Sequence, residues 1–187
     1  MSPIEKFSQW LQDYLEIATH QDVPMVLSTV DANGFPDSRV VLLKEFVDGE
    51  FIFYTNYHSV KGQQIAKCNT VSLNFYWPVL ARQVRVQGVA SIVSAAKSDE
   101  YFASRPYLSQ LSAIISQQSQ VISDLDALLI AFVQAQQQVE FKRPDYWGGY
   151  AVVPHLIEFW QAGEHRLHER IQYVYLNSEW HEQRLAP

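Results

Sequence analysis

The sequence predicts a mainly β protein with added helices, folded as a closed or nearly closed antiparallel barrel. Short runs rich in β-branched and aromatic residues recur along the chain, and the turn pairs Asn33-Gly34 and Asp48-Gly49 separate the first of them. Few hydrophobic helices are expected between these runs, and a closed barrel leaves no exposed sheet edge. The chain has 187 residues, 48% of them hydrophobic, which suffices for a single domain over residues 1–187.

The spacing of apolar residues predicts the elements of the first half. Residues 3 to about 20 place apolar side chains three and four apart, which indicates an amphipathic helix. After Pro24 the pattern changes to short β-rich runs, and a short helix over residues 59–67 is expected among them. Strands are expected at residues 25–30, 38–46, 51–56, 71–77 and 82–93.

The second half is expected to begin with helices and to end with strands. The first helix should end before Pro106, because the residue that precedes a proline avoids helical geometry. Ser123 or Asp124 is a candidate cap for the last helix, and residues 142–144 should form a loop. Helices are expected at residues 96–104, 109–116 and 124–139, and strands at 150–160, 170–176 and 178–185.

Composition narrows the class of function. A formal net charge of −6 and a pI near 5.4 argue against a general nucleic-acid binder, but they are compatible with a local basic pocket for a phosphate. Neither GxGxxG nor GxxxxGK[ST] occurs, so any phosphate must be held by side chains. The one cysteine, Cys68, cannot form an internal disulfide, and no signal core follows Met1, which together favour a cytoplasmic location. No apolar run approaches the roughly 20 residues that cross a bilayer, so no membrane association is expected.

Cations on two expected strands are candidates for ligand binding. Arg39 and Lys44 lie five residues apart, which puts them on opposite faces of a regular strand, where each could serve a different ligand group. The alternative is a pair of solvated charges at strand ends. The run RQVRVQG carries Arg82, Gln83 and Arg85, and an exposed alternating face explains it equally well.

The segment YFASRPYLSQ combines a phenol, a guanidinium and a hydroxyl, in Tyr101, Arg105 and Ser109. Such donors can hold a phosphate dianion, for which arginine offers a planar fork. A helix end with incidental polar residues is the alternative.

The segment EFWQAGEHRLHER is the densest in charge. In a strand, Arg166, His168 and Arg170 share one face, which indicates an anion opposite them. A charged sheet edge is the alternative. A metal site at His165-x-x-His168 is disfavoured because that spacing suits a helix better than a strand, and Cys68 has no base paired with it that would make it a nucleophile. No metal is therefore expected.

Taken in order, several of these motifs resemble the pyridoxamine 5'-phosphate oxidase family. The resemblance runs from about Pro3 to Pro187 and implies a split antiparallel β-barrel of the FMN-binding type, assembled as a homodimer with two FMN molecules at the subunit interface. The motifs are RVVLLK, FYTN followed by SVKGQQI, RQVRVQG, YFASRPYLSQ, QQS, EFWQAGEHRLHER and RLAP.

The resemblance also implies site residues. It assigns the substrate phosphate to Lys44, Tyr101, Arg105 and Ser109, and it places Arg166 and His168 near the pyridine ring and the reacting carbon, as catalytic groups that position the substrate. It implies FMN contacts from Arg39, Val40, Val41, Leu42, Leu43, Lys44, Tyr54, Thr55, Lys61, Gln83, Gln118, Ser119, Trp160 and Arg170.

The implied reaction is oxidation of pyridoxamine 5'-phosphate and pyridoxine 5'-phosphate to pyridoxal 5'-phosphate. Hydride passes from substrate C4' to flavin N5, and O2 reoxidises the flavin with release of H2O2. Two departures from the family pattern are expected to matter. Val60 precedes Lys61 where many members have an arginine that helps to hold the FMN phosphate, and the sequence begins close to the first helix, without a longer amino-terminal arm.

Two other functions compete with this interpretation. A related FMN oxidase of phenazine biosynthesis shares the RLHER element, although HRLHER together with VVLLK favours the vitamin B6 enzyme. A non-catalytic module that binds flavin or pyridoxal phosphate is the second, and the presence of every substrate-phosphate position argues against it.

Overall fold

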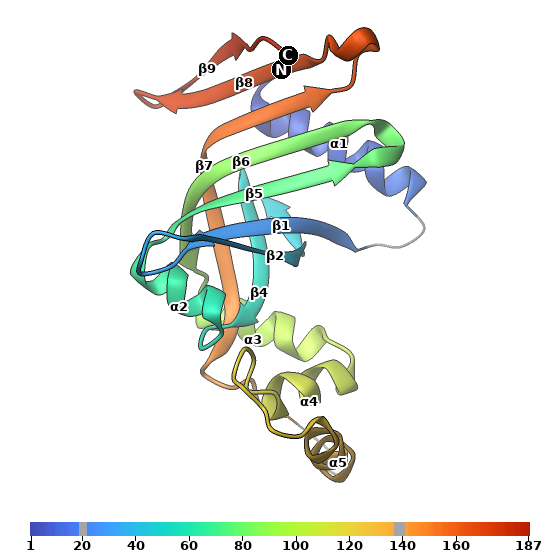
Figure 1. Cartoon of the computed structure of the whole chain (residues 1–187), viewed down its shortest axis with the longest axis vertical. Coiled ribbons are helices and arrows are strands. Elements are labelled where there is room, and N and C mark those ends of the chain that lie inside the picture. The colour runs from blue at the N-terminus through green and yellow to red at the C-terminus, as the bar shows by residue number, and fades with distance from the viewer. Residues whose placement is uncertain (19–21, 137–140) are drawn as a thin grey trace.

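The computed structural model describes residues 1–18, 22–136 and 141–187. Within these residues the strands form one antiparallel sheet in the order β2-β1-β5-β6-β7-β4-β3, and β8 pairs with β7 and β9 (Figure 1). The strands are β1 (Val23–Val30), β2 (Pro36–Leu43), β3 (Glu45–Val47), β4 (Glu50–Asn56), β5 (Thr70–Trp77), β6 (Arg82–Ile92), β7 (Trp147–Gln161), β8 (Glu169–Leu176) and β9 (Glu179–Arg184).

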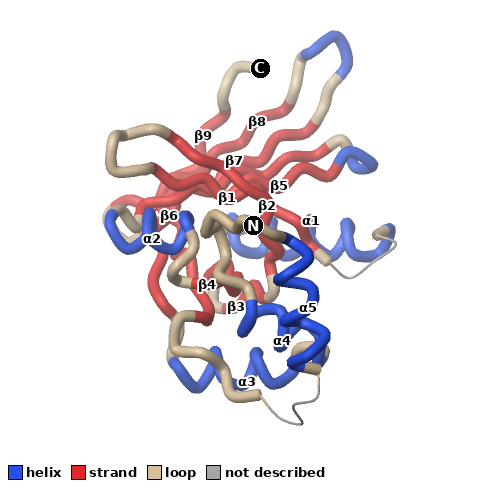
Figure 2. The backbone as a smooth tube through the Cα atoms, turned by 60° about the horizontal axis from the view of Figure 1, so that its bottom comes forward, coloured by secondary structure: helices blue, strands red, loops and turns tan. Residues whose placement is uncertain are grey.

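Helices cover one face and one end of this sheet. Figure 1 shows α3, α4 and α5 at one end of the molecule and α1 near the other end, and Figure 2 shows the same three helices together from another side. The helices are α1 (Pro3–Ile17), α2 (Val60–Lys67), α3 (Ala95–Ser104), α4 (Tyr107–Ile115) and α5 (Leu125–Ala135), and the short 3-10 turns are η1 (Pro78–Leu80) and η2 (Glu164–Arg166). Among the helices of the described residues, none has the length and apolar character needed to span a membrane.

The predicted barrel is confirmed as a curled sheet that is split along one side. The ends of the strand order, β2 and β3, are consecutive in the chain, and β2 packs beside β4 without a ladder between them. The backbone N–H of Lys44, between β2 and β3, donates to the carbonyl of Ile52 over 2.8 Å. The split between β2 and β4 is therefore a gap in hydrogen bonding that side chains and ligands can fill.

The long strand β7 explains how one sheet makes two layers. Its first half pairs with β4 and its second half with β8, while β6 follows it on the other side. The register shifts between Gln87 and Gly88, opposite Pro154, and a Cβ on Gly88 would lie 2.4 Å from the Val153 carbonyl oxygen. A bulge of this kind bends a strand, so the sheet turns at this point.

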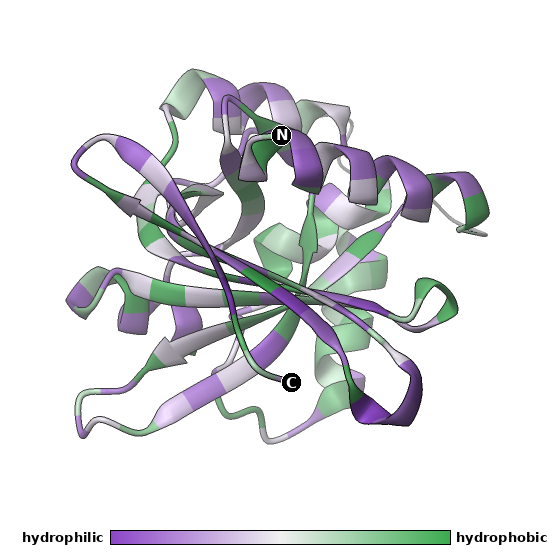
Figure 3. Ribbon diagram, turned by 90° about the horizontal axis from the view of Figure 1, so that it is seen from above, coloured by the Kyte–Doolittle hydropathy of each residue, from purple (hydrophilic) through white to green (hydrophobic). Residues whose placement is uncertain are grey.

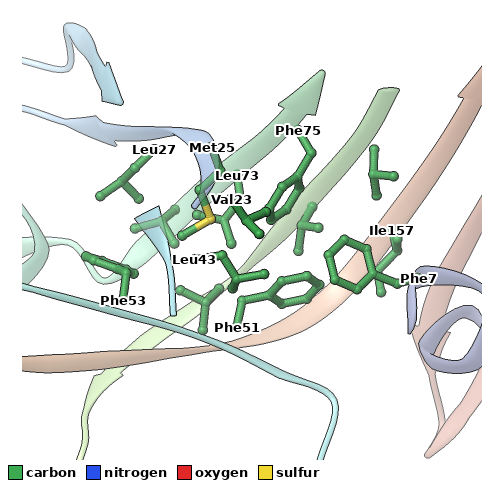
Figure 4. Packing of buried hydrophobic residues seen from close by; sticks show 14 of the residues in the cluster. Phe7, Val23, Met25, Leu27, Leu43, Phe51, Phe53, Leu73, Phe75 and Ile157 are labelled. Carbon is green, nitrogen blue, oxygen red and sulfur yellow. The ribbon is translucent and has the colours of Figure 1, made fainter. Parts of the chain in front are cut away.

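The core is aromatic and is closed by α1. Phe7 packs edge-on against Phe51 at 4.7 Å between ring centroids and lies 5.1 Å from Phe75. Figure 4 shows Phe7 projecting from its helix toward Phe51 and Ile157. Ser2 and Glu5 form a capping box that fixes the start of α1, and Figure 3 shows polar and apolar residues mixed along it.

Several predicted boundaries were wrong, each for a local reason. The first helix ends at Ile17 because Ala18 is extended, and residues 19–21 lie outside the described part. The strand expected over residues 38–46 begins at Pro36 and breaks at Lys44. Helix α4 starts directly after Pro106, and β7 starts three residues earlier than expected, at Trp147. The last part of the helix expected over 124–139 also lies outside the described residues, and α5 ends at Ala135.

Candidate active site

A cavity of about 740 Å³ lies at the split between β2 and β4. This volume suits a cofactor or a drug-sized ligand. Many of the residues expected to bind FMN or substrate line it together, although they come from β2, β4, α2, α3, α4 and the loop after α4. These are Arg39, Val40, Val41, Leu42, Lys44, Tyr54, Thr55, Lys61, Tyr101, Arg105, Ser109 and Gln118.

One part of the cavity holds two cations, Lys61 and Arg39. Lys61 is buried and donates to Gln118 Oε1 over 3.1 Å and to Ser59 Oγ over 3.3 Å. Burial lowers the pKa of Lys61, and the nearby positive charge of Arg39 lowers it further. A buried ammonium whose hydrogen-bond partners are neutral is costly, and the Asp37 carboxylate offsets this cost only in part, so this position favours an anionic ligand.

Arg39 is fixed by its own neighbours. Its Nη2 pairs with Asp37 at 2.5 Å and donates to Gln64 Oε1 over 3.3 Å, while Nη1 donates to Thr29 Oγ1. Thr29 and Gln64 are buried, so the guanidinium is held in one orientation beside the cavity.

A second cationic group lies around Arg105. Pro106 keeps Arg105 extended and starts α4, which brings Ser109 into the same cavity. The guanidinium lies 4.6 Å from the centre of the Trp147 ring, and its Nη1 is buried without a hydrogen-bond partner among the described residues. Burial lowers the pKa of Arg105. This is the donor set that a phosphate can satisfy.

Lys44 belongs to the same cavity as Arg39, contrary to the prediction of opposite faces. The strand ends at Leu43, so the alternation of a regular strand does not extend to Lys44. Its Nζ lies 3.1 Å from Asp22 Oδ1 in a partly exposed ion pair.

Aromatic rings form a wall of the cavity. Tyr54 and Tyr101 stack at 3.8 Å with planes 14° apart, and Trp147 lies parallel to Tyr101 at 6.2 Å. Gly149 stands opposite Tyr54 in the sheet, and a Cβ there would lie 2.8 Å from the Tyr54 ring. Burial and a hydrogen bond to Glu45 raise the pKa of Tyr54, so its hydroxyl stays protonated at neutral pH.

The remaining predicted residues do not line this cavity. Leu43 is buried in the core, and Ser119 lies in the loop after α4 with a positive φ of 72°. Gln83, Trp160 and Arg170 are direct cross-strand neighbours on β6, β7 and β8, and they form one row. Their side chains alternate with the core residues Val84, Phe159 and Ile171, so this row lies on the outer face of the sheet.

The shared strand face considered for Arg166, His168 and Arg170 does not form, because Arg166 and His168 precede the strand. Arg166 is exposed in η2, where His165 and Arg166 have positive φ values of 53° and 64°, and β8 begins only at Glu169. His168 lies against Trp160, with 4.7 Å between ring centroids, and its Nδ1 accepts a hydrogen bond from the Gly163 N–H over 3.2 Å. His168 therefore joins the row of Gln83, Trp160 and Arg170.

The sequence pattern missed Asp22, Pro106 and Trp147 as lining residues. Trp147 directly precedes Gly148-Gly149, a pair that makes room for aromatic neighbours, and this was the available signal. Asp22 had no signal, because its relation to Lys44 exists only once the strands are paired.

The antiparallel sheet is curled, and its unpaired edge opens onto a cavity with two cationic groups and an aromatic wall. These features define a split-barrel protein whose cavity suits a phosphorylated, planar ligand. Residues 12–139 match the family described as pyridoxamine 5'-phosphate oxidase, and residues 147–187 match the pyridoxine 5'-phosphate oxidase C-terminal dimerisation region. The chain belongs to the pyridoxamine 5'-phosphate oxidase family.

Similar sequences agree with this membership. A Legionella pneumophila (strain Lens) protein named pyridoxine/pyridoxamine 5'-phosphate oxidase is 50% identical over 188 residues, which cover 99% of this chain and 87% of that protein. A Haemophilus influenzae (strain 86-028NP) protein of the same name is 46% identical, with 100% of this chain and 90% of that protein covered.

Solved structures agree on the fold. PhzG from Burkholderia lata 383, in complex with tetrahydrophenazine-1-carboxylic acid, superposes with a TM-score of 0.95 at 27% identity, covering 100% of this chain and 93% of that one. A pyridoxamine 5'-phosphate oxidase-related, FMN binding protein from Nostoc punctiforme has a TM-score of 0.81 at 15% identity, covering 100% and 99%. The latter supports the split-barrel fold alone.

Proposed function

We propose that this chain is an FMN-dependent oxidase that converts pyridoxamine 5'-phosphate and pyridoxine 5'-phosphate to pyridoxal 5'-phosphate, with O2 as acceptor and H2O2 as product. The observation that carries the proposal is Nη1 of Arg105, which is buried and makes no hydrogen bond among the described residues, in the cavity that Lys44, Tyr101 and Ser109 also line. Membership of the family and relatives at 46 to 50% identity support the choice of substrate over the phenazine alternative, whose structural representative is 27% identical.

The residues present fit FMN. The cavity has the volume for a flavin and a small substrate together, and its two cationic groups match two separate phosphates. Lys61 and Arg39 are assigned to the FMN phosphate, and Lys44, Arg105, Tyr101 and Ser109 to the substrate phosphate. The edge of β2 from Arg39 to Leu42 lines the cavity, and among the described strands β2 pairs with β1 alone, so the backbone groups on its other edge suit the polar rim of a flavin.

The protein acts as a homodimer in this proposal. Gln83, Trp160 and Arg170 lie on the outer face of the sheet, away from the cavity of their own chain. The match of residues 147–187 to a dimerisation region supports a second copy on that face. Each subunit then supplies this row, with His168 and Arg166, to the cavity of its partner.

FMN supplies the hydride acceptor and the reaction with O2 when it is bound. The side chains of the protein orient the substrate. Lys44 and Arg105 fix the phosphate, and the wall of Tyr54, Tyr101 and Trp147 excludes water from the ring region. His168 Nδ1 accepts the Gly163 N–H, so a neutral imidazole carries its proton on Nε2 and presents a donor. Arg166 adds a permanent cation, and both residues position the pyridine ring.

The test is aerobic turnover with added FMN. Purified protein is given each B6 phosphate, and pyridoxal 5'-phosphate and H2O2 are followed together. Matched formation of both products supports the oxidase. Turnover of a tricyclic phenazine precursor in preference to the B6 phosphates would reassign the substrate, and an unchanged flavin spectrum on adding substrate without O2 would indicate a binding module.

A further inference from the structure

Glu158 is a buried carboxylate that the proposed function does not use. It lies on β7 on the outer face of the sheet and is only 3% exposed. Its Oε1 accepts hydrogen bonds from Arg170 Nε over 3.0 Å and from Arg170 Nη2 over 2.8 Å. Its Oε2 accepts a hydrogen bond from Arg85 Nη1 over 3.2 Å.

The register of the sheet makes this arrangement specific. Arg85 is directly opposite Glu158 on β6, while Arg170 is opposite Trp160 on β8 and so lies diagonally from Glu158. Diagonal neighbours in a sheet are within reach of long side chains. A carboxylate buried to this degree requires such partners, and two N–H groups of one guanidinium on a single oxygen fix its plane.

The carboxyl-terminal segment holds the same guanidinium from the other side. Arg170 Nη1 donates to the Ala186 carbonyl over 2.9 Å, and the Leu185 N–H donates to the Arg170 carbonyl over 3.0 Å. A guanidinium has five N–H donors. Three of these donors, one each on Nε, Nη1 and Nη2, bind Glu158 and Ala186. The other two make no hydrogen bond within the described residues, and the Arg170 side chain is 26% exposed.

We propose that Glu158 is a positioning residue, which holds Arg170 so that its two remaining N–H donors face outward in the row with Gln83 and Trp160. The inference rests on the proposed function, in which this row contacts the flavin bound to the partner subunit. Glu158 acts through Arg170 and touches neither flavin nor substrate.

The experiment is a double-mutant cycle on FMN affinity. The full-length protein is prepared without flavin as wild type, Glu158→Gln, Arg170→Met and the double variant, and the FMN Kd is measured by quenching of flavin fluorescence. Glu158→Gln keeps the shape and an acceptor oxygen but loses the charge, so it weakens binding by up to about tenfold. Arg170→Met weakens binding by at least as much, and the double variant binds no worse than Arg170→Met alone, because Glu158 then has nothing to position.

Asp13→Asn is the matched control. Asp13 also pairs with a partly buried arginine, Arg82, at 2.6 Å, but it lies on α1 and has no contact with Arg170. This variant keeps the wild-type Kd. If Glu158→Gln does not fold, two other variants go through the same cycle. Glu158→Asp keeps the charge on a shorter side chain, and Arg85→Met keeps the ion pair between Glu158 and Arg170.

The outcomes separate this inference from the proposed function. Additive losses in the cycle, or an FMN Kd unchanged by Glu158→Gln in a protein that oxidises its substrate, overturn the positioning role and leave the oxidase in place. Wild-type protein that binds no FMN overturns the oxidase and the positioning role together. A cycle in which the Glu158 effect vanishes without Arg170, with an altered visible spectrum of bound flavin in Glu158→Gln, supports the role.

Discussion

Replacing Arg105 with methionine separates stability from substrate binding, because the two should change in different directions. In the free protein, Nη1 of Arg105 is buried without a partner among the described residues. Such a donor costs about 1 to 3 kcal/mol, whereas the contact with the Trp147 ring, at 4.6 Å, contributes about 0.5 to 2 kcal/mol. The difference between these two ranges runs from a loss of about 1 kcal/mol to a gain of about 2.5 kcal/mol, so the free energy of unfolding should change little or rise.

Substrate binding should weaken strongly. In the proposed function Arg105 donates charge-assisted hydrogen bonds to the substrate phosphate, each worth about 1.5 to 3 kcal/mol, so Arg105→Met should raise KM for pyridoxamine 5'-phosphate by about tenfold to a hundredfold. Pyridoxamine without its phosphate should show a much smaller change. Urea denaturation of the free protein and steady-state kinetics with both compounds measure the two effects.

Arg143 provides the contrasting control. It is also largely buried, but it donates to Asp99 Oδ1 and to the Trp147 carbonyl, each over 2.6 Å. Arg143→Met should therefore lower the free energy of unfolding, because the Asp99 carboxylate and the Trp147 carbonyl lose the hydrogen bonds that Arg143 donates to them. A loss of stability in Arg105→Met as large as that in Arg143→Met, with KM unchanged, would refute the assignment of Arg105 to the phosphate.

Three further predictions follow from the cavity. Burial puts the pKa of Lys61 in the folded protein below its ordinary value of 10.5. Between these two pKa values the unfolded state binds more protons, so the free energy of unfolding should rise as pH approaches 10.5. Lys61→Met should flatten this rise in urea titrations at several pH values and weaken FMN binding, and an unchanged pH dependence would contradict the prediction. Val60→Arg, at the partly exposed start of α2, should tighten FMN binding by about tenfold or more if the new guanidinium reaches the phosphate, and equilibrium titration with FMN measures this. Asp22→Asn should release Lys44 and lower KM by no more than about fivefold, since a partly exposed ion pair is worth about 0 to 1 kcal/mol; a raised KM would show that Asp22 helps to bind substrate.

The sequence pattern was sufficient for most strands because the core residues alternate with polar ones. Val84 and Val86 are buried while Arg85 is exposed, as a period of two predicts. The same pattern could not reveal that β7 pairs with different strands in its two halves, because pairing is a long-range property. It also could not reveal η2, since His165 and Arg166 adopt a left-handed backbone that their residue types do not signal.

The sequence could name the candidate site residues as one set. It could not divide them into those that line the cavity and those that lie on the outer face of the sheet. Period two puts Gln83 on one face of β6 and Trp160 on one face of β7, yet only the register shows that they are neighbours of Arg170. The motifs that carry the resemblance name these residues as candidates, while the fold shows that some line the cavity and others lie on the outer face. This division is what a site shared between two subunits requires.

Both cationic groups of the cavity store unfavourable energy in the free protein. Lys61 is buried and donates to neutral oxygens, and Nη1 of Arg105 has no hydrogen-bond partner in the part of the chain that the structure describes. Neither arrangement stabilises the folded chain by itself, and a hydrophobic side chain at either position would give the folded chain a higher free energy of unfolding. The two groups become favourable when phosphates supply the missing charge, because ligands that bind only the folded state stabilise it by mass action. The stability of the fold and the occupancy of the site are thus linked through the buried Lys61 and the partly buried Arg105.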